Sequence, residues 1–156
     1  MGKMELTRDE IVREVERLKL EKKKIVFTNG CFDILHVGHI RYLKEAKNQG
    51  DILIVGLNSD SSVRSLKGPD RPINGEGERA EVLSALKPVD YVVIFSELDP
   101  KSLIMDIRPD VLVKGEDWNE DEIIGAAEVK SWGGRVVRAG LAPGSSTTSL
   151  IEKIRK

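Results

Sequence analysis

The sequence predicts an α/β fold, a Rossmann-like doubly wound sheet of five parallel strands with an extra helix ahead of the first strand. Five short apolar runs rich in Val and Ile alternate with helical patterns along the 156 residues. Most of these runs are continuous rather than alternating, as in strands that are buried on both faces of a parallel sheet. The alternation of such strands with helices favours a doubly wound arrangement.

The five predicted strands follow one another with helical patterns between them. In chain order they are Lys24–Thr28, Ile52–Leu57, Tyr91–Phe95, Val111–Lys114 and Arg135–Ala139.

The first helix is predicted over residues 7–21. Thr7 and Glu10 form a capping box ahead of an apolar stripe of Ile11, Val15 and Leu18. Because this helix precedes the first strand, it must pack on the outside of the sheet. Five further helices are predicted. Two are marked by apolar residues at helical spacing, namely Ile40, Leu43 and Ala46, and then Ala80, Leu83 and Leu86; a third begins at the cap Asp99-Pro100. A fourth begins at Asn119 with Glu122 and ends at Gly133-Gly134, and the last runs from about Ser146, with Leu150, Ile151 and Ile154 facing inward.

No linker rich in Pro, Gly or Ser divides the chain, so we expect a single domain over residues 1–156. Residues 1–22 would form the outer helix, and residues 23–156 would form the α/β core. The weakest zone, Lys67–Gly77, contains three Gly and two Pro and is predicted to be a long loop. Loops of that length are often functional.

Composition excludes several classes of protein. With 25 basic and 26 acidic residues the net charge is −1, which disfavours binding to a nucleic-acid backbone. A single Cys excludes an intrachain disulfide and fits a reducing compartment. No apolar stretch is long enough to cross a membrane, and the charged first 24 residues lack a secretory signal. We therefore expect a cytoplasmic protein with no nucleic-acid or membrane partner.

Ligands of open α/β sheets bind at the carboxyl ends of the strands, and both histidines of the chain lie there. His36 and His39 follow the first strand and lead into a helix, with Gly38 between them. A helix N-terminus favours phosphate, two imidazoles could donate hydrogen bonds to it, and Gly38 would let it approach the backbone. The alternatives are that the two rings simply pack, or that they bind zinc together with Cys31 and Asp33.

The segment Gly30–His39 resembles the G-x-F-D-x-x-H-x-G-H signature, containing the HxGH motif, of the cytidylyltransferase-like nucleotidyltransferase superfamily. Gly144–Thr148 is similar to the second motif of that superfamily, a Ser/Thr-rich turn before the last helix. The order and spacing of the two motifs agree over nearly the whole chain. The resemblance implies transfer of a nucleotidyl group from a nucleoside triphosphate to a phosphate acceptor.

Within the superfamily, three stretches most resemble bacterial D-glycero-β-D-manno-heptose 1-phosphate adenylyltransferases: Phe27–Asp33, Lys67–Asn74 and Val113–Trp118. The resemblance implies that ATP and heptose 1-phosphate give ADP-heptose and pyrophosphate. Many members carry a sugar kinase ahead of this domain, and we expect the stand-alone form here.

The competing families are set aside on sequence grounds. Glycerol-3-phosphate cytidylyltransferases usually have an Arg shortly before the Ser/Thr turn, which Leu141–Thr148 lacks. Class I aminoacyl-tRNA synthetases share a related motif but need tRNA-binding domains. A non-catalytic nucleotide sensor on the same fold is the rival from another class, and the intact histidine pair and Ser/Thr turn favour the enzyme.

Residue roles follow from the resemblance and from position in the predicted fold. His36, His39 and Lys67 are the expected catalytic residues, and Asp33 and Arg71 the expected substrate-binding residues. The expected nucleotide-binding residues are Cys31, Phe32, Gly38, Lys114, Asp117, Ser146, Thr147 and Thr148. Mg²⁺ would arrive with the triphosphate, without protein ligands of its own. The expected partners are ATP, a sugar phosphate and a second copy of the chain in a homodimer.

Simpler roles stand beside several of these. Ser146, Thr147 and Thr148 could cap a helix. Asp33 could form an Asx turn, orient His36 or contact the sugar phosphate. Cys31 is interpreted as a small packed residue rather than a nucleophile.

The charged and Gly-rich parts of the long loop also have simpler roles. Lys67 and Arg71 could close over the triphosphate or form a solvated charged face. Arg79 is interpreted as a surface residue at a helix start. Gly75–Ala80 fits G-x-G-x-x-A but follows no strand, so we assign it to the loop.

Overall fold

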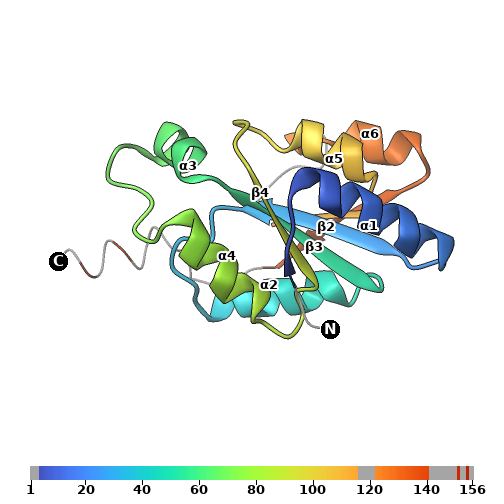
Figure 1. Cartoon of the computed structure of the whole chain (residues 1–156), viewed down its shortest axis with the longest axis horizontal. Helices are drawn as coiled ribbons and strands as arrows, with labels where there is room; N and C mark the ends of the chain where they lie inside the picture. Colours follow the sequence, from blue (N-terminus) through green and yellow to red (C-terminus); the bar gives the residue numbers. More distant parts are fainter. Residues whose placement is uncertain (1–3, 116–121, 141–150, 152–153, 155–156) are drawn as a thin grey trace.

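A parallel sheet between two helical layers forms the body of the protein (Figure 1). The computed structural model describes residues 4–115, 122–140, 151 and 154. Within them six strands lie in the order β1-β4-β3-β2-β5-β6, and every neighbouring pair is parallel. The predicted doubly wound α/β fold is therefore confirmed.

All five predicted strands are present. They are β2 (Ile25–Gly30), β3 (Ile52–Asn58), β4 (Tyr91–Phe95), β5 (Val111–Gly115) and β6 (Arg135–Ala139). A sixth strand that the sequence did not predict, β1 (Met4–Glu5), forms one edge of the sheet and pairs with β4 through two residues only.

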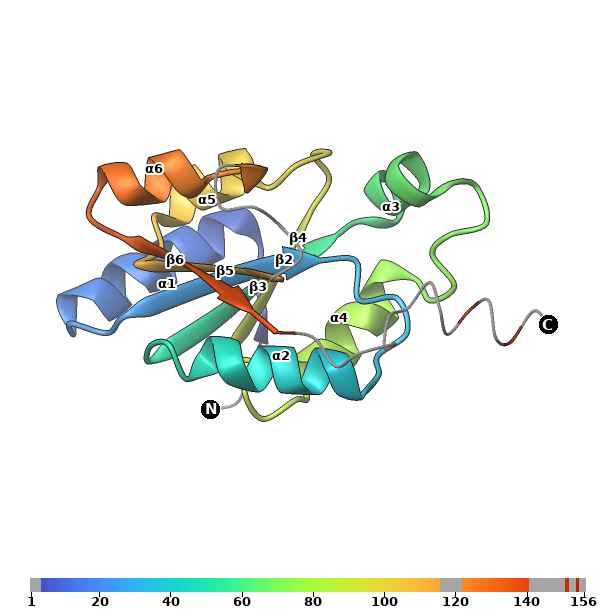
Figure 2. The ribbon, with the colours of Figure 1, turned by 180° about the vertical axis from the view of Figure 1, so that it is seen from behind.

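The helices cover both faces of the sheet (Figure 2). One layer contains α1 (Arg8–Leu20), α5 (Lys101–Ile107) and α6 (Ala126–Ser131), and the other contains α2 (Val37–Lys47) and α4 (Glu76–Ser84). Each layer buries its own apolar cluster against the sheet. The predicted capping box of Thr7 and Glu10 is present, and α1 buries Ile11, Val15 and Leu18 as expected.

One helix and two boundaries differ from the sequence predictions. Helix α3 (Asp60–Lys67) was not predicted, because it is polar and buries only Ser62 and Val63. The predicted loop Lys67–Gly77 ends early, since Gly75 is the N-cap of α4, and Gly75–Ala80 therefore opens a helix. Helix α6 begins at Ala126, not at Asn119, and residues 119–121 lie outside the described residues.

The last predicted helix, from about Ser146, lies mostly outside the described residues. Ile151 and Ile154 are described, and both are helical. Ile151 is buried as predicted, whereas Ile154 is 71% exposed, so the expectation that it faces inward was wrong.

Helix α2 is held to the sheet by a buried group of hydroxyls. The Tyr42 hydroxyl lies 2.7 Å from Thr28 Oγ1. The carbonyl of Val113 lies 3.1 Å from the Tyr42 hydroxyl and 2.9 Å from Thr28 Oγ1 and can accept from either, so the two hydroxyl protons serve three contacts. These bonds join α2 to β2 and β5, and they fix the position of the histidine segment at the start of the helix.

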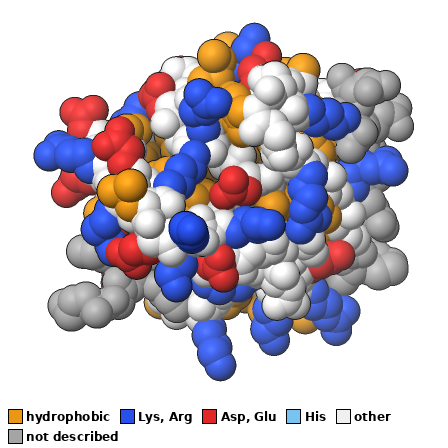
Figure 3. All heavy atoms as spheres, turned by 90° about the vertical axis from the view of Figure 1, so that its right-hand side faces the viewer, with side chains coloured by type: hydrophobic (Ala, Val, Ile, Leu, Met, Phe, Trp, Pro, Cys, Tyr) orange, Lys and Arg blue, Asp and Glu red, His pale blue; other side chains and the backbone are white. Residues whose placement is uncertain are grey.

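The amino ends of the strands form the edge opposite to the histidines. Lys and Arg side chains spread over this face, with Asp and Glu between them (Figure 3). Helices α1 and α2 both end here with basic residues in their last turns, where cations stabilise the helix dipole. In the described part of the chain, no helix combines the length and apolar character that a membrane crossing requires.

Candidate active site

The loop after β2 and the first turn of α2 place both histidines at the carboxyl edge of the sheet. His36 is the N-cap of α2, and its Nδ1 accepts from the backbone N–H of Gly38 at 3.1 Å. His39 Nδ1 accepts from the N–H of His36 at 3.3 Å. An Nδ1 that accepts carries no proton, so the neutral ring is protonated at Nε2. Each histidine therefore offers an Nε2–H donor.

Both rings are neutral at physiological pH. They stack with centroids 4.0 Å apart and 30° between their planes. Burial lowers the pKa of His39 to about 4, with a smaller contribution from the neighbouring His36. Burial also lowers the pKa of His36. The pair can thus donate hydrogen bonds without bringing two positive charges together.

Two buried polar atoms have no partner among the described residues, and both belong to this region. They are His36 Nε2 and Asn29 Oδ1. An unsatisfied buried polar group costs about 1–3 kcal/mol, so each one requires an explanation such as a ligand. The sequence analysis gave Asn29 no role, because nothing in the chain marks a single amide as unpartnered.

Phe32 supports the second histidine. Its ring is 7% exposed and lies 5.3 Å, centroid to centroid, from the ring of His39. The backbone of Phe32 has φ of 45°, an uncommon value for a bulky residue. A Cβ on Gly30 would lie 2.9 Å from the Phe32 ring, so only glycine fits at that position. The Phe32 side chain thus packs on a predicted catalytic residue.

Asp33 fastens the loop between α3 and α4, residues 68–75, to the histidine segment. Its carboxylate accepts from the N–H of Ile73 and of Asn74 at 2.8–2.9 Å and from Arg71 Nε at 2.8 Å. Burial raises the pKa of Asp33, but these hydrogen bonds together lower it below its ordinary value. The charged carboxylate therefore binds the loop. None of its described hydrogen bonds goes to His36, which the sequence analysis had considered as a partner.

Cations gather around the carboxyl end of β2. Burial raises the pKa of the Cys31 thiol, and the charges of Lys67, Arg79 and Arg71 partly oppose that rise. The thiol is thus protonated at neutral pH, in keeping with the packed residue predicted for Cys31. The side chain of Arg71 is 11% exposed, and no described residue accepts from its terminal amino groups. Lys67, the last residue of α3, is exposed.

Arg79 is not a surface residue, contrary to the sequence interpretation. Its side chain is 1% exposed, and the guanidinium donates to three backbone carbonyls and one carboxylate. The acceptors are Asn74 O at 2.9 Å, Cys31 O at 2.7 Å, Asn58 O at 2.8 Å and Asp60 Oδ1 at 2.8 Å.

Of the remaining predicted site residues, Gly38 and Lys114 are described by the structure and the others are not. Gly38 is buried in the first turn of α2, and its N–H donates to His36 Nδ1; a close approach of phosphate to this backbone stays a prediction. Lys114 lies near the end of β5 and is half-buried. Asp117 and the turn residues Ser146, Thr147 and Thr148 lie outside the described residues.

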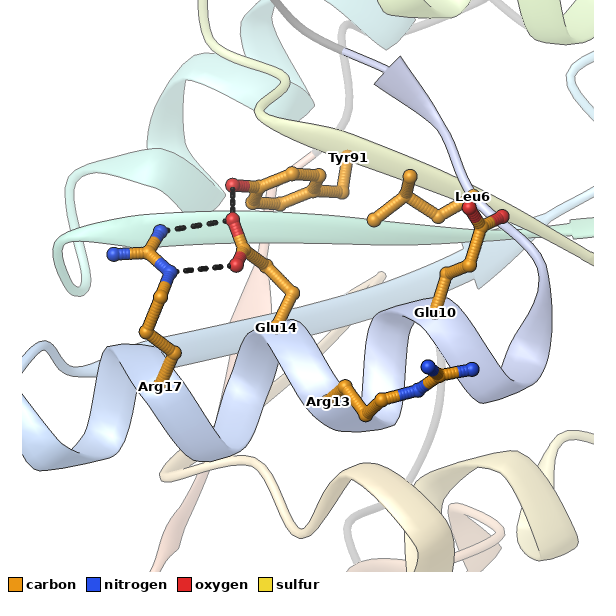
Figure 4. Close-up of a pocket in the computed structure, with 6 residues that line it drawn as sticks. All are labelled: Leu6, Glu10, Arg13, Glu14, Arg17 and Tyr91. Carbon is orange, nitrogen blue, oxygen red and sulfur yellow. Dashed lines mark hydrogen bonds and ion pairs between the residues drawn. The ribbon is translucent and has the colours of Figure 1, made fainter.

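Two cavities lie at opposite ends of the sheet. A cavity of about 140 Å³ adjoins the histidine segment, lined by Phe32, Asp33, Leu35, Asn74, Glu78, Arg79 and Val82. A wider one of about 440 Å³ lies between α1 and the start of β4 (Figure 4). There Glu14 accepts from both Arg17 and the Tyr91 hydroxyl, so the charges of this cavity largely satisfy one another. The smaller cavity lies beside the histidine segment through Phe32 and Asp33, and neither histidine is among its lining residues.

The described residues contain no cluster of three or more His, Cys, Asp or Glu that could hold a metal ion. The zinc alternative therefore finds no ligand set among the described residues. A Mg²⁺ ion would instead rely on phosphate oxygens and water, which is its usual mode with nucleotides.

Comparison with known proteins places this geometry in a family. "Bifunctional protein HldE" of Methylobacillus flagellatus is 51% identical over 146 residues, which make up 94% of this chain and 30% of the relative. The chain thus spans less than a third of the length of the curated relatives it matches.

Solved structures agree with this match. A lipopolysaccharide core biosynthesis protein from Thermoplasma volcanium is 34% identical with a TM-score of 0.67, over 77% of this chain and 98% of that chain. A pantoate-beta-alanine ligase from Francisella tularensis, 17% identical with a TM-score of 0.66 over 98% of this chain and 73% of its own, shares the fold. Residues 27–153 match the cytidylyltransferase-like family model, and the chain belongs to that family.

Proposed function

We propose that this chain transfers AMP from ATP to a sugar 1-phosphate, heptose 1-phosphate, and releases ADP-heptose and pyrophosphate. Membership of the cytidylyltransferase-like family supports nucleotidyl transfer. The choice of ATP and heptose 1-phosphate rests on the motif resemblance and on the HldE relatives.

One observation carries the proposal. His36 Nε2 is a buried hydrogen-bond donor with no acceptor among the described residues, and it stands at the N-terminus of an eleven-residue helix. Phosphate oxygens are the acceptors that a helix N-terminus favours. A triphosphate bound at this edge would satisfy the donor that the folded chain leaves unpaired.

The reaction needs no covalent intermediate. A phosphate oxygen of the acceptor attacks the α-phosphorus of ATP, and the bond to the bridging oxygen of the β-phosphate breaks in line with it. Pyrophosphate carries away the electron pair. Catalysis then depends on position and on stabilising charge at the phosphoryl oxygens.

Separate groups of residues carry out these tasks. His36 and His39 donate from Nε2 to the phosphoryl oxygens, and Phe32 keeps the His39 ring in place. Arg71, held by Asp33 through Nε, directs to the acceptor phosphate the amino groups for which no described residue is an acceptor, and Lys67 neutralises charge on the leaving group. Ser146, Thr147 and Thr148 hold the outgoing phosphates in this proposal. Mg²⁺, when bound to the triphosphate, would neutralise part of its charge.

The test is pyrophosphate release by the purified chain with ATP or CTP, each paired with heptose 1-phosphate or glycerol 3-phosphate. We expect turnover with ATP and heptose 1-phosphate that exceeds every other pairing. Preference for CTP with glycerol 3-phosphate would contradict the proposal and favour a cytidylyltransferase. Nucleotide binding without turnover in any pairing would favour a sensor.

A further inference from the structure

Arg79 joins four separate parts of the site with one side chain. Nη1 bridges the carbonyls of Cys31 and Asn58, at the ends of β2 and β3, over 2.7 and 2.8 Å. Nε holds the carbonyl of Asn74 in the α3–α4 loop at 2.9 Å. Nη2 holds the Asp60 carboxylate, at the start of α3, at 2.8 Å. Helix α4, which carries Arg79, is thereby tied to the ends of β2 and β3, to the start of α3 and to the α3–α4 loop.

The loop itself is fastened at only two points among the described residues. One is Asp33, which binds the backbone of Ile73 and Asn74 and the side chain of Arg71. The other is Arg79. Between α3 and this double attachment the chain passes through Gly68, at φ of 105°, where an added Cβ would meet no atom within 4 Å. Loss of the Arg79 attachment would therefore leave Asp33 to hold the loop alone.

We propose that Arg79 is a positioning residue for the acceptor side of the reaction, an inference that rests on the proposed function. Four of its five N–H donors already have protein acceptors, so it acts through the segments that it holds. It sets the distance between the α3–α4 loop and the end of β2, and so helps to position Arg71, which Asp33 holds in the same loop. A displacement of about 1 Å can cost on the order of 10²-fold in rate, and a lost guanidinium fork permits such a displacement.

The geometry explains why arginine stands here. Four acceptors surround the side chain in different directions, and three of them are backbone carbonyls that no substitution elsewhere could remove. Only a guanidinium offers five N–H donors in a fixed fork. A lysine would keep the charge near Asp60 but could reach fewer carbonyls, and the loop carbonyl of Asn74 would lose its donor.

The kinetic test compares Arg79→Lys and Arg79→Gln with the wild-type full-length chain. We expect both to lower kcat/KM for the sugar phosphate by on the order of 10²-fold, with the KM for ATP changed less than about threefold. Added methylguanidinium should restore part of the turnover of an Arg79→Gly variant. Equal losses for ATP and for the acceptor, or no loss at all, would overturn the proposal.

Two controls separate position from stability. Leu83→Ala creates a cavity in the same helix, at a residue with 0% exposure, and is expected to lower Tm without changing the ratio of the two KM values. Arg13→Gln removes an exposed arginine that lines the cavity between α1 and β4. It should change neither Tm nor the ratio of the two KM values. A shift in the KM ratio for Leu83→Ala would show that loss of stability alone explains the Arg79 variants.

Amide hydrogen exchange tests the placement without any substrate. In Arg79→Gln the amides of Ile73 and Asn74, which bond to Asp33, should exchange at least about tenfold faster, whereas that of Leu53 in β3 should not. Unchanged exchange at Ile73 and Asn74 would overturn the proposal even if turnover fell. If the wild-type chain transfers no nucleotide, the proposed function fails, and faster exchange would still show that Arg79 holds the loop.

Discussion

At the scale of residues, the two histidines combine roles in folding and in chemistry. Each uses Nδ1 to accept a backbone N–H at the start of α2, which fixes the tautomer and leaves Nε2–H for a ligand. The helix start is thus capped by the same side chains that would bind phosphate. Sequence alone indicated the pair, but the tautomers depend on backbone geometry that no motif records.

Replacing either histidine by alanine should remove one donor to the phosphoryl oxygens. We expect His36→Ala and His39→Ala to lower turnover by on the order of 10²–10³-fold, with binding of ATP weakened far less. Pyrophosphate release measures the first effect, and calorimetric titration of ATP the second. Turnover near the wild-type rate in either variant would exclude that histidine from the mechanism.

The stability of the fold should depend on pH through His39. An unfolded histidine has a pKa near 6.5, whereas in the folded chain burial lowers it to about 4. Between these values the unfolded chain binds more protons, so the free energy of unfolding falls as the pH drops from about 6.5 towards 4.

The matched variant for this effect is His39→Asn, whose amide oxygen can still accept from the N–H of His36. Between about pH 7.5 and 5, wild type should lose about 1–2 kcal/mol more stability than this variant, measured by urea unfolding. An identical loss in both proteins would contradict the depressed pKa.

At the scale of elements, helix α2 carries the site and is held by hydroxyls that are buried in the sheet. The hydroxyls of Thr28 and Tyr42 both lie within hydrogen-bond reach of the Val113 carbonyl, which can accept from either. The same edge depends on β2, whose last residues lead into Phe32 and Asp33. A change that loosens α2 from β2 and β5 would therefore move both histidines.

A double-mutant cycle on this group should be non-additive. Tyr42→Phe and Thr28→Val should each cost about 1 kcal/mol, because the Val113 carbonyl keeps one side-chain donor in either case. The double variant removes both donors and should cost more than the sum of the two. Urea unfolding of the four proteins measures the coupling, and strict additivity would refute the shared acceptor.

At the scale of the whole molecule, continuous apolar runs that alternate with helical patterns were sufficient to predict five strands and that they are parallel. They could not predict β1, which is two residues long, or α3, which has almost no apolar face. Arg79 was misjudged because its acceptors are mainly backbone carbonyls, and these leave no trace in a sequence. Position at the carboxyl edge indicated His36, His39 and Asp33, whereas Arg71 was singled out in the long loop; the bond from Arg71 to Asp33 joins the two segments.

Metal removal should affect catalysis and not the fold. Since the described residues hold no metal-binding cluster, the ion is expected to enter with the triphosphate. We predict that EDTA abolishes turnover, that excess Mg²⁺ restores it, and that Tm without nucleotide is unchanged throughout. A fall in Tm on adding EDTA would instead indicate a resident metal.

The predicted homodimer is tested by mass. Light scattering on the eluting peak of a size-exclusion column should give twice the 17.4 kDa of one chain. A mass of one chain at micromolar concentration would contradict the prediction.

A crystal structure with a non-hydrolysable ATP analogue tests the phosphate cradle itself. We expect the α- and β-phosphates within hydrogen-bond reach of His36 Nε2 and His39 Nε2, with the outgoing phosphates beside Ser146, Thr147 and Thr148. A triphosphate bound elsewhere, or imidazole rings turned into the apolar interior, would contradict the central claim.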